Sequence, residues 1–327
     1  MTRYLSLSRV LVMLGVFLAA GARAQESSAS TRVTVPGVRI GEVAGHAFIP
    51  TTFLQDPFVR TALRTGVGFG GTLGFEIPPP TVAGKPVDGL TGSLLFALLD
   101  LEYQHAIRDW LAVRLQMNVI GRLADETPTL ISQGVTLASG FQLGWLFTLA
   151  ESEHLHLSGT LQVKKASTTD IYLQRFLEGI IENGEVLPGN TLVATTPTLR
   201  GSTGVQGAYV ISRLTGVTVT ADLDYGESVA RGDADRWFYR VAAAFDFNLL
   251  SAGGPPMGFV IGGATGSSPL ATTGDTRTTQ SLFGRIAYTG AEDFALGLDM
   301  SYALLPVRNL SDKQGFLSAV VDVRLYF

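Results

Sequence analysis

Apolar and polar residues alternate over the last thirteen residues of the chain, 315–327. The apolar positions are Leu317, Ala319, Val321, Val323, Leu325 and Phe327. Polar side chains, among them Asp322 and Arg324, lie between them. Because successive side chains of a β-strand point to opposite faces, this period of two predicts a strand with one apolar and one polar face.

The same alternation recurs upstream and predicts twelve strands in all. Their approximate ranges are 61–77, 91–105, 110–122, 134–150, 154–165, 197–211, 215–226, 236–249, 256–264, 279–289, 293–304 and 316–327. The range 134–150 is long for one strand, and 256–264 is short and rich in glycine. Ten or fourteen strands therefore remain as alternatives.

The connections between these strands alternate between short and long. The short ones are 106–109, 151–153, 212–214, 250–255 and 290–292, and the long ones are 78–90, 123–133, 166–196, 227–235, 265–278 and 305–315. An even number of strands joined in this way is typical of bacterial barrels whose short turns face the periplasm. We therefore expect both ends of the strand-forming region on the periplasmic side.

The composition favours a membrane barrel over a soluble sheet. Hydrophobic residues make up 46% of the chain and charged residues 16%, against a usual charged share of about 25%. The mean hydropathy is +0.27, yet no apolar run after residue 24 reaches the roughly 20 residues that a spanning helix needs. In hydrocarbon, strands can satisfy their backbone only as a closed barrel. The predicted fold class is all-β, a transmembrane antiparallel up-and-down β-barrel of about 12 strands.

A strand that ends the chain on an aromatic residue resembles the assembly signal of bacterial outer-membrane β-barrel proteins, carried here by Val323, Leu325 and Phe327. The resemblance covers almost the whole chain after residue 24 and is to the porin-like class, not to one family within it. It implies a location in the bacterial outer membrane, contact with outer-membrane lipid and lipopolysaccharide, and recognition by the barrel-assembly machinery.

The N-terminal residues predict export. A positively charged start is followed by an apolar stretch, Val10 to Ala20, and by a small-x-small cleavage site at residues 22–24. This arrangement predicts a Sec signal peptide over residues 1–24. The chain has no cysteine, which argues against a lipoprotein anchor and excludes disulfides and thiolate metal ligands.

Two segments depart from the strand pattern. Residues 25–60 are either an extended leader along the periplasmic rim or a plug in the lumen, and both interpretations stay open. The part from residue 36 onward also resembles the lumenal hatch of the long-chain fatty acid transporters, which have fourteen strands and a more helical hatch. The second segment, Thr169 to Asn183, has apolar residues at helical spacing and Gly184 after it, which predicts a short amphipathic loop helix. This helix would constrict the lumen, lie on the outer leaflet or cap the barrel mouth.

Charged residues at polar strand positions are predicted to face the lumen. They are Glu76, Asp100, Glu102, Arg114, Arg122, Lys164, Arg200, Asp222, Asp224, Arg236, Arg240, Asp246, Arg285, Asp299, Asp322 and Arg324. Such charges either screen solutes in a polar pore or pair with one another to fill the interior. A barrel of about twelve strands is wider than the eight-stranded barrel that side chains just fill, so it has room for a small passage.

Neither catalysis nor a cofactor is expected. The histidines at 105, 154 and 156 fall at the periplasmic ends of strands, the wrong end for lipid-modifying chemistry at the outer rim. His154 and His156 lack a third ligand at a fixed spacing, so we interpret them as solvated residues at the rim and expect no metal. The net charge of −4 gives no reason to expect nucleic acid as a partner.

The sequence therefore predicts a signal peptide at 1–24, a periplasmic leader or lumen plug at 25–60 and a transmembrane barrel at 61–327. The leading interpretation of its function is an outer-membrane channel or transporter that passes small solutes through a polar lumen. The alternative is a closed barrel with a structural or surface-interaction role through its external loops, and a lipid-modifying enzyme is a minor third.

Removal of Phe327 is expected to slow assembly in cells, because the terminal aromatic residue completes the predicted assembly signal. The amount of folded barrel at the cell surface, followed after induction, measures this effect. Surface levels equal to those of the intact chain would contradict it.

Overall fold

The computed structural model describes residues 41–73, 81–82, 85–86, 94–124, 135–171, 193–227, 234–267, 278–291, 293–306 and 313–327. The predicted signal peptide and the first part of the 25–60 segment lie outside these residues, so their boundaries stay predictions.

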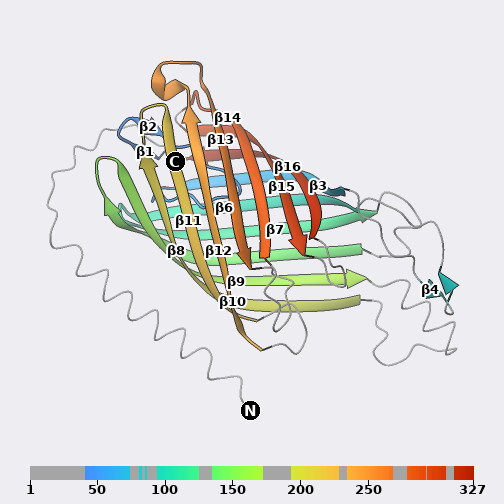
Figure 1. Cartoon of the computed structure of the whole chain (residues 1–327). Helices are drawn as coiled ribbons and strands as arrows, with labels where there is room; N and C mark the ends of the chain where they lie inside the picture. Colours follow the sequence, from blue (N-terminus) through green and yellow to red (C-terminus); the bar gives the residue numbers. More distant parts are fainter. Residues whose placement is uncertain are drawn as a thin grey trace, which may run out of the picture.

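Twelve antiparallel strands form a closed barrel in which each strand pairs with its neighbours in the chain and the last pairs with the first (Figure 1). The wall consists of β3 (Ala62–Leu73), β6 (Leu94–Arg108), β7 (Leu111–Ala124), β8 (Val135–Glu151), β9 (Leu155–Ile171), β10 (Val193–Val210), β11 (Thr215–Gly226), β12 (Arg236–Asn248), β13 (Met257–Ser267), β14 (Thr278–Tyr288), β15 (Phe294–Pro306) and β16 (Lys313–Tyr326). The predicted barrel and its strand number are confirmed.

Four very short strands are not part of the barrel wall. They form the hairpins β1 (Glu42–Val43) with β2 (His46–Ala47) and β4 (Thr81–Val82) with β5 (Lys85–Pro86). The turn of the first hairpin has positive φ at Ala44 and Gly45. This hairpin lies at the same end of the barrel as the C-terminus, whereas β4 lies at the opposite end (Figure 1).

The seam between β16 and β3 closes the wall. The register places Val321 opposite Val67, and the backbone N–H of Phe327 donates a hydrogen bond to the Thr61 carbonyl at 3.1 Å. The C-terminal residue therefore sits on the seam itself. Because both edges of the sheet are paired there, the wall leaves no open strand edge in the membrane.

The two faces of the wall differ as the alternation predicts. On β16, Val321 and Leu325 point outward and are exposed, whereas Asp322 and Arg324 point inward and are buried. Large apolar side chains such as Phe245 of β12 cover the outer face elsewhere. An apolar exterior around a charged interior is the arrangement that a bilayer selects.

Several strand ends differ from the predicted ones, most of all in β9 and β10. β9 continues to Ile171. Near its end, Ser167 and Thr169 pair with Pro197 and Thr195 of β10. Polar residues occupy both faces of this stretch, so the period-two signal fades although the strands continue.

The loop helix predicted for Thr169–Asn183 is wrong over its first three residues, which belong to β9. The remainder of that prediction lies outside the described residues. In the part of the chain that the structure describes, the single helical element is a 3₁₀ turn, η2 (Leu250–Ala252). No described helix is long and apolar enough to cross a membrane.

Substitution of Val321 by arginine is expected to destabilise the barrel by about 2–4 kcal/mol, because it places a charge on the lipid face near the middle of β16. Gln116→Arg is the matched control, since Gln116 faces the lumen and lines a polar cavity. Unfolding by guanidinium chloride in lipid vesicles measures both variants. Equal losses for the two would contradict the register.

Candidate functional site

Residues 41–60, called the lumenal segment here, contact inward-facing side chains of the wall. They enter at the end of the wall that carries the short turns and return to the same end, where β3 begins. Phe48, Ile49, Leu54 and Phe58 of this segment are buried. Of the two positions left open by the sequence, these contacts favour the lumenal one, which stays a proposal.

At the short-turn end, the lumenal segment is held through His46. The His46 imidazole is fully buried, with Nε2 3.1 Å from Oδ1 of Asp246 and Nδ1 2.9 Å from the carbonyl oxygen of Arg213. The other carboxylate oxygen of Asp246 accepts a hydrogen bond from the Ile49 backbone at 2.6 Å.

Deeper in the lumen, the segment meets a buried ion cluster. Arg285 of β14 is fully buried and donates to Asp299 of β15 at 2.7 Å and to Asp322 of β16. The Thr52 backbone donates to the same Asp299 oxygen at 3.1 Å. One arginine between two carboxylates leaves spare acceptor capacity, and the lumenal segment uses part of it.

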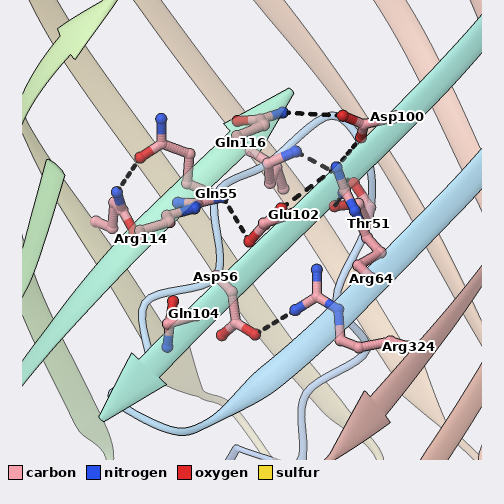
Figure 2. Close-up of polar contacts among 12 residues, drawn as sticks. Thr51, Gln55, Asp56, Arg64, Asp100, Glu102, Gln104, Arg114, Gln116 and Arg324 are labelled. Carbon is pink, nitrogen blue, oxygen red and sulfur yellow. Dashed lines mark hydrogen bonds and ion pairs between the residues drawn. The ribbon is translucent and has the colours of Figure 1, made fainter. Parts of the chain in front are cut away.

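A second cluster lies on β3, β6 and β7. Arg64 bridges Asp100 and Glu102, and Arg114 donates to Glu102 at 2.9 Å (Figure 2). Arg64 also donates to the Thr51 carbonyl at 3.3 Å. The cluster therefore binds the segment through its backbone as well as balancing its own charges.

Arg64 and Arg324 stand directly opposite each other in the wall, on β3 and β16. Like charges in such a pair repel. Asp56 of the lumenal segment supplies the counter-charge: its carboxylate accepts a hydrogen bond from Arg324 at 2.6 Å and pairs with Arg60 (Figure 2). Burial by itself raises the pKa of Asp56, but Arg60 and Arg324 outweigh it and hold the pKa below its usual value. The wall thus contains a cation whose partner comes from the segment.

Apolar contacts complete the fit. Ile49 and Leu54 pack against Ala242, Val260 and Phe283, which face inward from β12, β13 and β14. Exposing these inward-facing apolar side chains to water would cost free energy. The lumenal segment covers them and so removes that cost.

Two wall glycines make room for the segment. A Cβ on Gly216 would lie 2.5 Å from the Phe48 ring, and one on Gly258 would lie 3.1 Å from Cγ1 of Ile49 and clash with its Cδ1. As long as Phe48 and Ile49 are present, a larger residue at Gly216 or Gly258 would push the segment away from the wall.

The return path of the segment contacts β9 and β6. The buried His156 imidazole lies 3.0 Å from the Pro57 carbonyl oxygen and stacks on Phe58 at a centroid distance of 4.7 Å. Gln104 donates to the carbonyl oxygens of Phe58 and Arg60 at 2.8 and 2.9 Å. The interpretation of His156 as a solvated rim residue is therefore wrong, because the lumenal segment covers it; His154 is exposed.

A cavity of about 210 Å³ lies beyond the tip of the segment. Residues 52–55 form its floor, and charged side chains line its walls. Those side chains are Arg64, Glu102, Arg114, Lys164, Arg200, Asp222, Asp224 and Arg240. Arg240 also donates to the Phe53 carbonyl at 2.7 Å, which ties the floor to the wall.

Most of the charges predicted from the sequence to face the lumen have inward positions in the structure. Glu76 lies outside the described residues, and Arg122 is described only by its backbone in β7. The wall brings the others into groups: one around Arg285, one around Glu102 and one around the cavity, where Lys164 pairs with Asp224 at 3.0 Å. Their role in selecting solutes stays a prediction.

Sequence reasoning missed Arg64, His46 and Asp56. Arg64 could have been found, because it alternates with the outward Val67 and Phe69 on the first strand. The others gave no comparable signal, since their positions depend on contacts between distant parts of the chain. No group of three or more histidine, aspartate or glutamate residues suited to a metal occurs among the described residues.

A closed antiparallel barrel with an apolar exterior and a charged interior defines a class: this chain has the fold of a transmembrane β-barrel of the outer-membrane type. No family model and no curated protein sequence matches it. Among solved structures it is similar to the NanC porin, with 8% identity, coverage of 82% of this chain and 100% of that one, and a TM-score of 0.47. It is also similar to the translocator domain of autotransporter NalP from Neisseria meningitidis, with 11% identity, coverage of 84% and 91%, and a TM-score of 0.49. A third is a Pseudomonas aeruginosa FadL homologue, with 10% identity, coverage of 82% and 90%, and a TM-score of 0.43. These likenesses concern the fold and carry no information about a substrate.

Neutralisation of Asp56 by Asp56→Asn is expected to loosen the lumenal segment. Hydrogen bonds to charged groups contribute about 1.5–3 kcal/mol, so amide exchange over residues 51–60 should accelerate roughly 10- to 100-fold. Hydrogen–deuterium exchange with mass spectrometry measures this rate. Glu42→Gln, which removes an exposed acidic group from the same segment, is the control. Unchanged exchange in Asp56→Asn would show that the ion pair does not hold the segment.

Proposed function

We propose that this protein is an outer-membrane channel for small polar solutes and that the lumenal segment is a plug whose displacement opens it. The observation that carries the proposal is the set of contacts between residues 41–60 and inward-facing side chains at the short-turn end of the wall. A polar cavity remains on their far side. A solute from the long-loop end would reach this cavity first and meet the plug as its floor.

In this proposal, the plug blocks a lumen that is too wide for the wall's own side chains to fill. Side chains alone just fill a barrel of eight strands, and this wall has twelve. Between the segment and the wall, a space of about 20 Å³ remains near Ile49 and Val260. That is little more than the roughly 10–15 Å³ that one water molecule requires. In this proposal, a solute passes the segment only when the segment moves.

The way the plug is attached permits such movement. In the described part of the chain, no backbone-to-backbone hydrogen bond joins residues 41–60 to a wall strand. Both ends of the segment lie at the short-turn end, so it can withdraw toward the periplasm without threading through the wall. The wall keeps all its strand pairing when the segment leaves.

Single-channel conductance of the refolded mature protein in a planar bilayer tests the proposal. The intact protein should conduct rarely or in brief openings, and a version without residues 25–60 should conduct steadily. A disulfide between Ile49→Cys and Gly258→Cys provides a second arm that keeps the plug and locks it. The chain has no other cysteine, so this would be its one disulfide.

Oxidation of the cysteine pair should abolish conductance, and a reducing agent should restore the behaviour of the intact protein. Persistent openings in the oxidised form would show that the plug does not gate the passage. Silence of both the deletion and the reduced form, with a folded barrel verified by heat-modified mobility on a gel, would favour a closed barrel acting through its external loops. The Arg285 cluster, in which one buried arginine pairs with both Asp299 and Asp322, is the feature consistent with that alternative.

A further inference from the structure

The wall places two cations directly opposite each other at a second point. Lys164 of β9 stands opposite Arg200 of β10, in the same relation as Arg64 and Arg324 near the other end. At the first point Asp56 of the lumenal segment supplies an anion between the wall strands. At the second point the facing space is the cavity of about 210 Å³.

The protein groups around this second pair leave positive charge uncompensated. Lys164 is paired with Asp224 at 3.0 Å. Arg200 donates through Nε to the Glu227 carbonyl at 2.9 Å, and among the described residues no carboxylate oxygen lies within 4 Å of its guanidinium. Five arginines and lysines line the cavity against three acidic residues, and Asp100, which pairs with Arg64 from just outside the lining, leaves one cation in excess.

Phe238 holds the cationic face in place. The Arg200 guanidinium carbon lies 3.7 Å from the centre of the Phe238 ring, and that of Arg236 lies 4.9 Å from it. The ring holds the Arg200 guanidinium by cation–π attraction. A guanidinium held in place suits a planar or tetrahedral oxyanion.

Two further groups define what else the ligand carries. Arg114 lines the cavity, is buried, and has no hydrogen-bond partner at Nε or Nη1 among the described residues. Asp222 lines it too, and its Oδ1 lacks a partner. Unpaired donors favour an acceptor-bearing ligand, and the unpaired carboxylate oxygen favours a hydroxyl donor on the same molecule.

We propose that this cavity binds a small hydroxylated organic anion whose carboxylate or phosphate lies between Lys164 and Arg200. A cavity of about 150 Å³ holds benzene, so this one has room for a six-carbon chain or ring. The inference names the solute class for the proposed channel and rests on that function for its biological meaning. The binding itself requires no transport.

Isothermal titration of the refolded mature protein in detergent tests the site with two matched pairs of probes. Gluconate is compared with the neutral polyol sorbitol, and glucose 6-phosphate with glucose. At least one anion should bind, and the neutral partners should bind at least about tenfold more weakly. The anion that binds with the higher affinity shows whether the site prefers a carboxylate or a phosphate. Equal heats for charged and neutral probes would overturn the proposal.

Three variants localise the binding. Arg200→Gln should weaken anion affinity at least tenfold, and Arg200→Lys should retain part of it. Arg213→Gln, which removes a cation from the turn at the opposite end of the barrel, should have no effect. Because folded variants show heat-modified mobility, each is checked on a gel. Equal anion affinity in Arg200→Gln and the intact protein would overturn the site. If Arg200→Gln does not fold, Lys164→Gln takes its place and should show the same tenfold loss of anion affinity.

The outcomes separate this inference from the channel proposal. Anion binding without conductance in the plug deletion would leave a binding site on a closed barrel and refute the channel. Conductance without anion binding would leave the channel and refute the site.

Discussion

Every backbone donor and acceptor of a chain in hydrocarbon needs a partner within the protein, and the rest of this structure depends on that requirement. Twelve strands meet it by closing the sheet between β16 and β3. Closure fixes an interior that is wider than its own side chains can fill. The contents of that interior, and therefore the function of the protein, follow from how the excess space is used.

The interior is organised by the need to pair buried charges. A buried cation without a partner costs several kcal/mol, so the position of each partner is constrained by the others. Arg285 finds its partners on adjacent wall strands, whereas Arg324 obtains Asp56 from the lumenal segment. The wall and the segment are therefore complementary: the wall supplies glycine and alanine where the segment is bulky, and the segment supplies charge and backbone donors where the wall needs them.

The sequence predicted the wall well because each strand carries its own signal. The alternation around Val321 and Asp322 is local, so strand number, register and the inward charges could be read without knowledge of the partners. β9 extends beyond its predicted end since Ser167 and Thr169 leave no apolar face to detect. The lumenal segment was left undecided for a different reason: Asp56 meets Arg324 across 268 positions and His46 meets Asp246 across 200. No short-range pattern records contacts of that kind.

The position of residues 41–60 inside the barrel is the central claim, and disulfide formation in intact outer membranes tests it most directly. Cysteines at Ile49 and Gly258 should oxidise in high yield, because a Cβ at 258 lies 3.1 Å from Cγ1 of Ile49. Cysteines at Ile49 and Ile261, whose side chain points to the lipid, should remain unlinked. No link between 49 and 258, or equal yields for both pairs, would contradict a lumenal position and the account built on it.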